Sequence, residues 1–179
     1  MSAPQREFPA DLQSVMNELG RSEQEARELV EGLSDAQMNC RPKSGAAWSI
    51  AQCLDHLARI NAIYIASLRA ALRERDSTTA PRRGPIRPAW LSRLFIRTMD
   101  APARRKFSAP TRAMPLSHIG GEASLNGFVH SHDEVRKLVL ECVDVDLNRI
   151  RFKNPFVRVL AFTVGTGLLI ILAHDRRHL

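Results

Sequence analysis

The chain contains little cysteine and few aromatic residues. Three of its 179 residues are cysteine and none belongs to a C-x-x-C pair, which argues against a disulfide framework and against a thiolate zinc site. Aromatic residues make up 6% of the chain, with a single tyrosine, whereas β-sandwiches and β-barrels are rich in aromatic and β-branched residues. Alanine, leucine and arginine are plentiful and favour helices. The composition therefore predicts an all-α protein in a reducing compartment.

The sequence has no long apolar run, and we expect no secretory leader. The longest uncharged apolar run, residues 159–173, has 15 residues, whereas a spanning helix needs about 20. The N-terminus has no basic segment followed by an apolar one, so we expect no secretory signal. A chain of 179 residues with 44% hydrophobic and 25% charged residues is expected to form one folded domain over residues 1–179. We therefore expect a cytoplasmic protein without a membrane span.

Positive charge is concentrated in one segment. The formal net charge is +7, and 12 of the 26 basic residues lie between Arg69 and Arg112 beside only three acidic ones. Five prolines fall in the same interval, so we interpret residues 77–123 as a long basic connection rich in proline and arginine. A weaker alternative is that this connection binds nucleic acid or an anionic surface. Because a proline-rich connection is not a groove-binding helix, we do not expect a nucleic-acid partner.

Apolar residues recur at three- and four-residue steps, the spacing of amphipathic helices, in four segments. The first covers residues 11–33, with Asp11 as its expected cap. The second covers residues 50–72, where Ser49 and Gln52 have the spacing of a capping box.

The other two helices are predicted in the second half of the chain. One helix follows the expected cap Ser124 and ends near Cys142. The last covers residues 156–179, and Pro155 is expected at the start of its first turn. A shorter amphipathic helix is predicted over residues 90–99, within the basic connection. The sequence thus predicts a four-helix bundle with a long crossover connection between helices two and three.

The sequence ends in LAHDRRHL, which places His174 and His178 four residues apart. On a helix both rings project from one face and could share a cation. Two ligands do not complete a metal site, and a third would come from a facing helix. The other interpretation is a pair of solvated histidines near a helix C-terminus, where positive charge is favourable.

Two parts of the sequence resemble the DinB-like (YfiT-like) superfamily. The segment GLSDAQMNCRPKSGAAWSIAQCLDHLARI carries the family's Arg-Pro, Trp-Ser-Ile and His-Leu elements in order, and the terminal HDRRHL matches its H-x-x-x-H element. A proline-containing approach to the third helix, here residues 109–115, is also typical of the family. The resemblance extends from about residue 11 to the last residue.

The resemblance implies a fold, a cofactor and a class of reaction. The fold is a four-helix bundle with a long connection after helix two, and the cofactor is a divalent metal, zinc or nickel, held by His56, His174 and His178. An open coordination position would activate water or a thiol, as in a hydrolase or a thiol S-transferase. A small-molecule substrate, a low-molecular-weight thiol and a homodimer are implied in the same way.

Several other side chains are candidates for the surroundings of the metal. Trp48, Asn61, Tyr64 and His132 are expected to line the pocket, although Trp48 could instead plug the mouth of the bundle. His132 lies on an apolar stripe and therefore needs a polar partner. Asp175 could accept a hydrogen bond from a ligand imidazole or pair with a surface arginine. The alternative to an enzyme is a non-catalytic bundle that binds a ligand or a partner.

Overall fold

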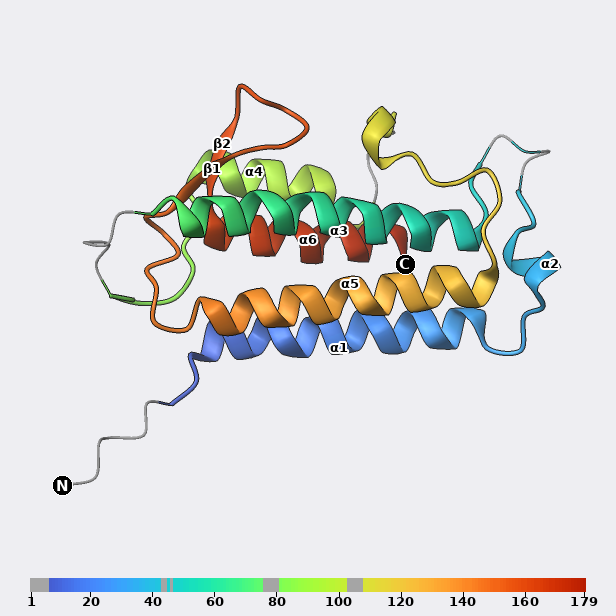
Figure 1. The fold of residues 1–179 in the computed structure, drawn as a ribbon, viewed down its shortest axis with the longest axis horizontal. Coiled ribbons are helices and arrows are strands. Elements are labelled where there is room, and N and C mark those ends of the chain that lie inside the picture. Colours follow the sequence, from blue (N-terminus) through green and yellow to red (C-terminus); the bar gives the residue numbers. More distant parts are fainter. Residues whose placement is uncertain (1–6, 43–44, 46, 76–80, 103–107) are drawn as a thin grey trace.

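Four long helices make up most of the computed structural model, which describes residues 7–42, 45, 47–75, 81–102 and 108–179 (Figure 1). Residues 1–6, 43–44, 46, 76–80 and 103–107 lie outside this description, so residues 77–80 and 103–107 of the predicted connection are not described. The long helices are α1 (Ala10–Val30), α3 (Ile50–Arg73), α5 (Gly121–Glu141) and α6 (Val164–His178). Shorter elements are α2 (Asp35–Met38), α4 (Trp90–Met99), the 3-10 turn η2 (Thr111–Ala113), and the strands β1 (Arg151–Lys153) and β2 (Ala161–Thr163). The all-α prediction is confirmed.

The directions of the helices account for the long connection. Helix α3 packs against α5 and α6, and α1 packs against the same two helices. Figure 1 shows that α3 and α5 run in one direction while α1 and α6 run in the other. Because α3 and α5 are neighbouring parallel helices, the chain between them must return along the length of the bundle. On the way, α4 packs on α6 and η2 packs on α3. None of the described helices has the length and hydropathy that a membrane crossing requires.

Helix α3 begins with the predicted capping box. The Ser49 hydroxyl accepts a hydrogen bond from the Gln52 backbone N–H, and the Gln52 side chain accepts one from the Ser49 N–H, both at 3.2 Å. The Gln52 amide also donates to the carbonyl of Leu116 at 3.0 Å. The cap thus ties the segment that follows η2 to the start of α3.

The expected cap of the first helix is wrong. Helix α1 begins at Ala10 behind Pro9, with no side-chain cap. The Asp11 carboxylate instead accepts hydrogen bonds from the Arg82 guanidinium and, at 2.8 Å, from the backbone N–H of Ile86. Asp11 therefore holds the crossover connection against α1, because an ion pair with Arg82 outweighs local capping.

The expected cap of the third helix is also wrong. Helix α5 begins at Gly121, and the Ser124 hydroxyl donates to the Gly121 carbonyl at 2.7 Å inside the first turn. The Gly121 backbone N–H, at the start of the helix, donates a hydrogen bond to the Asp35 carboxylate at 2.6 Å. Asp35 belongs to α2, a short helix in the predicted loop that begins with its own capping box at Ser34 and Gln37.

The last helix begins later than predicted, because residues 151–163 form a β-hairpin. The Asn154 side chain accepts hydrogen bonds from the backbone N–H groups of Phe156 and Val157, at 2.9 and 2.8 Å. This local turn replaces the first turn of a helix. Phe152 and Phe162 lie opposite each other in the antiparallel register, and both are buried.

Helix α6 starts where Thr163 provides a cap, its hydroxyl accepting from the Thr166 N–H at 3.3 Å. The two glycines that follow allow neighbours to approach the helix closely. A Cβ atom at Gly165 would lie 2.9 Å from Ile86, and one at Gly167 would lie 2.6 Å from Leu68. Both distances are shorter than van der Waals contact, so these positions require glycine.

Replacing Gly167 with alanine is expected to lower the free energy of unfolding by about 1–3 kcal/mol, because the added methyl group overpacks the core between Leu68 and Phe152. Gly20→Ala is the matched control. Nothing lies within 4 Å of a Cβ at Gly20 in the middle of α1, so that change is expected to stabilise the protein by roughly 0.5–1 kcal/mol. Urea unfolding of both variants measures the difference, and equal effects would contradict the close packing at α6.

Candidate metal centre

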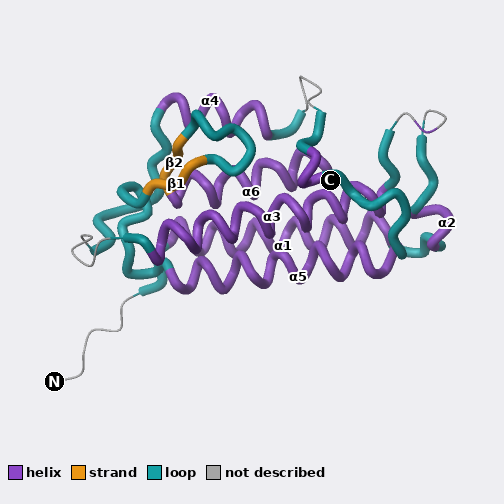
Figure 2. The backbone as a smooth tube through the Cα atoms, turned by 45° about the horizontal axis from the view of Figure 1, so that its top comes forward, coloured by secondary structure: helices purple, strands orange, loops and turns teal. Residues whose placement is uncertain are grey.

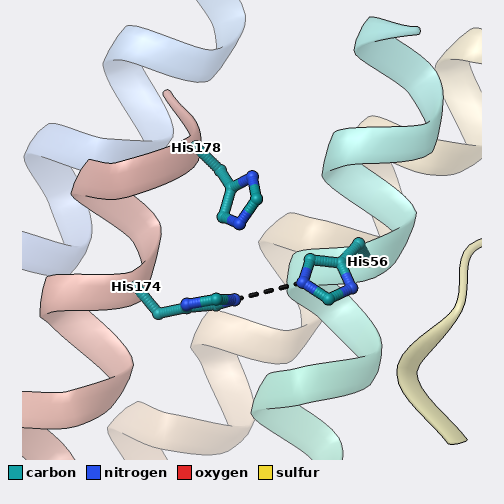
Figure 3. A group of neighbouring side chains, drawn as sticks. All are labelled: His56, His174 and His178. Atoms are coloured by element: carbon teal, nitrogen blue, oxygen red, sulfur yellow. Dashed lines mark hydrogen bonds between the residues drawn. The ribbon is translucent and has the colours of Figure 1, made fainter. Parts of the chain in front are cut away.

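Three histidines from two helices converge at one end of the bundle (Figure 3). His56 comes from α3, and His174 and His178 come from successive turns at the end of α6. One ring nitrogen of each lies within 4.8 Å of the other two. The Nε2 atoms of His56 and His174 are 3.1 Å apart. Two imidazoles bound to one tetrahedral zinc ion, at about 2.0–2.1 Å each, hold their nitrogens about 3.3–3.4 Å apart. The three rings could therefore hold one ion after small adjustments.

A backbone carbonyl fixes the orientation of His56. Its Nδ1 lies 2.6 Å from the carbonyl oxygen of Ala113 in η2. Because a carbonyl only accepts, Nδ1 must carry the proton, and the lone pair then lies on Nε2, which faces the other two rings. The Asp55 carboxylate holds the same segment by accepting from the Leu116 N–H at 2.8 Å. Sequence reasoning missed Ala113, since a backbone carbonyl leaves no signature in the side chains.

Burial keeps the three imidazoles neutral. It lowers the pKa of His56, and it lowers the pKa of His174 further because His178 and His56 add their repulsion. Burial also lowers the pKa of His178, to about 4, with His56 contributing. At neutral pH all three rings therefore offer lone pairs, as metal ligands must.

The two arginines between His174 and His178 pair with groups outside the histidine cluster. Arg176 donates two hydrogen bonds of 2.9 Å to Asp100, at the end of α4, and one of 2.5 Å to Glu18 on α1. Arg177 donates to the carbonyl of Thr98 at 2.9 Å. These contacts fasten the C-terminal end of α6, which carries His174 and His178, to two other helices.

The structure places Trp48 against the histidine cluster. Its ring centroid lies 4.8 Å from that of His56 and 6.3 Å from that of His178. Trp48 is half-buried and immediately precedes the Ser49 cap. The indole therefore shields one side of the cluster from solvent.

His132, Asp175 and Asn61 belong to a different buried cluster. His132 on α5 lies with Nε2 3.1 Å from Asp175 Oδ2 and with Nδ1 3.2 Å from Glu23 Oε1. We call Glu23, His132 and Asp175 the buried polar network. It joins α1, α5 and α6. Asn61 donates to Ser131 Oγ at 3.1 Å. In the part of the chain that the structure describes, Oδ1 of Asn61 and Oδ1 of Asp175 have no hydrogen-bond partner.

The buried polar network carries charge in the core. Burial alone would lower the pKa of His132, but hydrogen bonds with Asp175 and Glu23 outweigh it and raise that pKa to about 9. Burial alone would raise the pKa of Glu23, but hydrogen bonds from His132 and Arg136 outweigh it and lower that pKa to about 2. Burial raises the pKa of Asp175. His132 is therefore a cation between two acidic side chains at neutral pH.

Tyr64 lies towards the β-hairpin. Its hydroxyl accepts a hydrogen bond from Asn154 at 2.9 Å, and its ring lies 6.2 Å from Phe152 and 5.7 Å from Phe156. Burial raises the pKa of Tyr64 to about 12. The contacts of Tyr64 are thus with the hairpin and not with the three histidines.

Comparison with known protein families places the chain among them. A family model described as the DinB superfamily matches residues 18–179. Neither the curated proteins nor the solved structures contain a match. The matched region includes His56, His174 and His178 and all three residues of the buried polar network.

Proposed function

The chain belongs to the DinB superfamily, and from this premise we propose that it is a divalent-metal-dependent enzyme whose ion is held by His56, His174 and His178. The observation that carries the proposal is the convergence of three neutral imidazoles within 4.8 Å. Imidazole ligands suit zinc and nickel, and we propose one of these as the resident ion.

Three ligands from the protein leave coordination positions open, as in catalytic zinc sites. A divalent ion in such a site lowers the pKa of a water or a thiol and so provides a nucleophile near neutral pH. The chain's own groups prepare the site. The Ala113 carbonyl holds the His56 tautomer, and Trp48 limits access of solvent from one side.

The nucleophile is proposed to come from outside the chain. Cys53 lies one helical turn before His56, but burial raises its pKa. Burial also raises the pKa of Cys142, to about 12. Because the thiolate is the reactive form, neither side chain is activated at neutral pH. We therefore propose a hydrolase or a thiol S-transferase, with water or a low-molecular-weight thiol acting on a small-molecule substrate.

The metal content of purified protein tests the first part of this proposal. Wild-type protein is expected to retain about one zinc or nickel ion per chain, and the affinity of His56→Ala for that ion is expected to fall by at least about 100-fold, since even outer-shell partners contribute about 10–100-fold. His118→Ala is the control, because that exposed side chain lies in a loop away from the cluster. Equal, negligible metal in wild type and His56→Ala would overturn the proposal.

The reaction is tested separately on protein loaded with metal. Wild type is expected to turn over either a thiol with an electrophile or an ester or amide, and His56→Ala is expected to lose that activity. A metal-loaded wild type that is inactive throughout this panel would favour the non-catalytic ligand-binding bundle instead.

A further inference from the structure

Helix α4 is apolar on two sides, and the residues that the structure describes cover only one of them. Ser92 and Phe95 face the body of the protein, where the Phe95 ring lies 4.9 Å from that of Phe162 in β2. The residues on the outer side are large and exposed: Trp90 at 67%, Leu91 at 58% and Leu94 at 53%. A ten-residue surface helix normally covers its apolar side and shows a polar one, so this outer side is unusual.

The β-hairpin beside α4 carries further exposed apolar residues. Val159 is 91% exposed and Val157 is 39% exposed. Figures 1 and 2 both show the hairpin beside α4 on the same side of the bundle, and the contact between Phe95 and Phe162 joins the two elements. We call Trp90, Leu91, Leu94 and Val159, together with the arginines described next, the α4–hairpin surface.

The nearest acidic residue to α4 in the sequence, Asp100 at its C-terminal end, is paired with Arg176. Residues 77–99 and 147–163 contain no aspartate or glutamate. The exposed arginines Arg93 and Arg97 on α4 and Arg158 at the hairpin tip form no ion pair among the described residues. By contrast, Arg82 pairs with Asp11 and Arg149 with Asp146. The arginines of the α4–hairpin surface therefore remain available to anions.

We propose that the α4–hairpin surface docks the protein onto a lipid bilayer that carries anionic headgroups. Exposed tryptophan, leucine and valine can enter the boundary between headgroups and acyl chains, where tryptophan is favoured. Arg93, Arg97 and Arg158 can meanwhile pair with lipid phosphates, since long basic side chains reach the headgroup level from an apolar helix face. The helix lies in the plane of the interface and does not cross the bilayer.

Charge and hydrophobicity together favour a bilayer over the other occupants. A second copy of the chain meeting the same surface would bring unpaired arginines against arginines. A nucleic acid duplex would neutralise the arginines but would leave Leu91, Leu94 and Val159 against hydrated phosphates. An anionic bilayer supplies a phosphate layer and an apolar layer within about 5–10 Å of each other, which matches both features of the surface.

Sedimentation with lipid vesicles tests the proposal. Wild-type protein is expected to bind vesicles of phosphatidylcholine mixed with phosphatidylglycerol, to bind weakly to phosphatidylcholine alone, and to dissociate as salt is raised. Arg93→Gln combined with Arg97→Gln is expected to weaken binding about 25-fold, since each basic residue near an anionic surface contributes about fivefold. Trp90→Ala is expected to weaken it about tenfold through lost apolar contact.

Leu140→Ser is the matched control, because Leu140 on α5 has the same 58% exposure as Leu91 but lies outside the α4–hairpin surface. It is expected to bind vesicles like the wild type, and all variants are expected to keep the wild-type unfolding midpoint. The chain has two tryptophans, so the emission of the wild type should shift to the blue on vesicles, whereas Trp90→Phe, which retains Trp48, should show no shift.

Three outcomes would overturn the proposal. The first is no binding to anionic vesicles at low salt. The second is vesicle binding that neither the arginine variant nor Trp90→Ala weakens. The third is binding to duplex DNA that is tighter than binding to anionic vesicles and is not weakened by Trp90→Ala, which would assign the surface to nucleic acid.

Discussion

The variant His132→Leu is expected to lose about 3–5 kcal/mol of unfolding free energy at pH 7, as is typical when one partner of a buried charged pair is removed. His132 and Asp175 are both 0% exposed. Glu23, on the opposite side of His132 from Asp175, is largely buried. Without the imidazolium, Asp175 would lose its hydrogen-bonded cation in the core, and Glu23 would keep only Arg136, at 2.6 Å. Urea unfolding followed by circular dichroism measures the loss.

A double variant separates this electrostatic cost from lost packing. His132→Leu combined with Asp175→Leu is expected to recover most of the loss, because replacing both buried partners with apolar groups of similar size is often nearly neutral. It also removes the Asp175 oxygen that has no partner among the described residues. His130→Leu, at an exposed position on the same helix, is expected to stay within about 0.5 kcal/mol of wild type. Equal losses in the single and double variants would contradict the charge argument.

The pH dependence of the free energy of unfolding gives a second measure of how much the pair of His132 and Asp175 stabilises the protein. Hydrogen bonds with Asp175 and Glu23 raise the pKa of His132 from its ordinary value of 6.5 to about 9 in the folded protein. A raised pKa means that the folded state holds the proton more tightly, so the stabilisation is complete below pH 6.5 and is lost as the pH rises through about 9. The difference in stability between wild type and His132→Leu is therefore expected to shrink across that interval.

Features that depend on side chains within one helical turn could be predicted from the sequence. The capping box of Ser49 and Gln52 joins residues three positions apart, and its geometry follows from the helix itself. Helix α4 could also be predicted from local apolar spacing, and its bounds of Trp90–Met99 coincide with the predicted residues. His174 and His178 share one side of α6 for the same reason, since their four-residue spacing is one turn.

Features that depend on distant segments could not be predicted in this way. Asp11 and Ser124 are good capping residue types, but Asp11 binds Arg82, 71 residues away, and the free N–H at the start of α5 is bound by Asp35, 86 residues away. Tertiary partners of this kind override local propensity. The hairpin before α6 was missed because Asn154 forms its turn where apolar spacing alone indicates a helix.

The site itself shows both kinds of information. His56 is 118 residues from His174, and only the resemblance to a family brought the two together before the structure did. The network of Glu23, His132 and Asp175 had no local signal, since its members come from three helices. An Asp directly after a ligand histidine suggests a role beside the metal, yet adjacent residues on a helix point about 100° apart, and Asp175 faces α5 instead.

Zinc is expected to raise the free energy of unfolding of the wild type by about 4 kcal/mol when free zinc is about 1,000 times its dissociation constant. The three ligand rings lie together only in the folded state, because His56 is separated from His174 by 118 residues of chain. For a chain of this length such a gain corresponds to a rise of roughly 8–16 °C in the unfolding midpoint. Thermal unfolding with and without zinc, after removal of bound metal by a chelator, measures it.

His174→Ala is expected to abolish this gain, since the Nε2 atom 3.1 Å from that of His56 is lost and only two ligands remain. His118→Ala should keep the full gain, because His118 takes no part in the cluster. Zinc that bound loosely to histidines and cysteines anywhere on the surface would stabilise wild type and His174→Ala alike, and it would also bind the unfolded chain and reduce the effect. A gain confined to proteins that keep His56, His174 and His178 is therefore a signature of one site built by folding, and equal gains in wild type and His174→Ala would show that folding builds none.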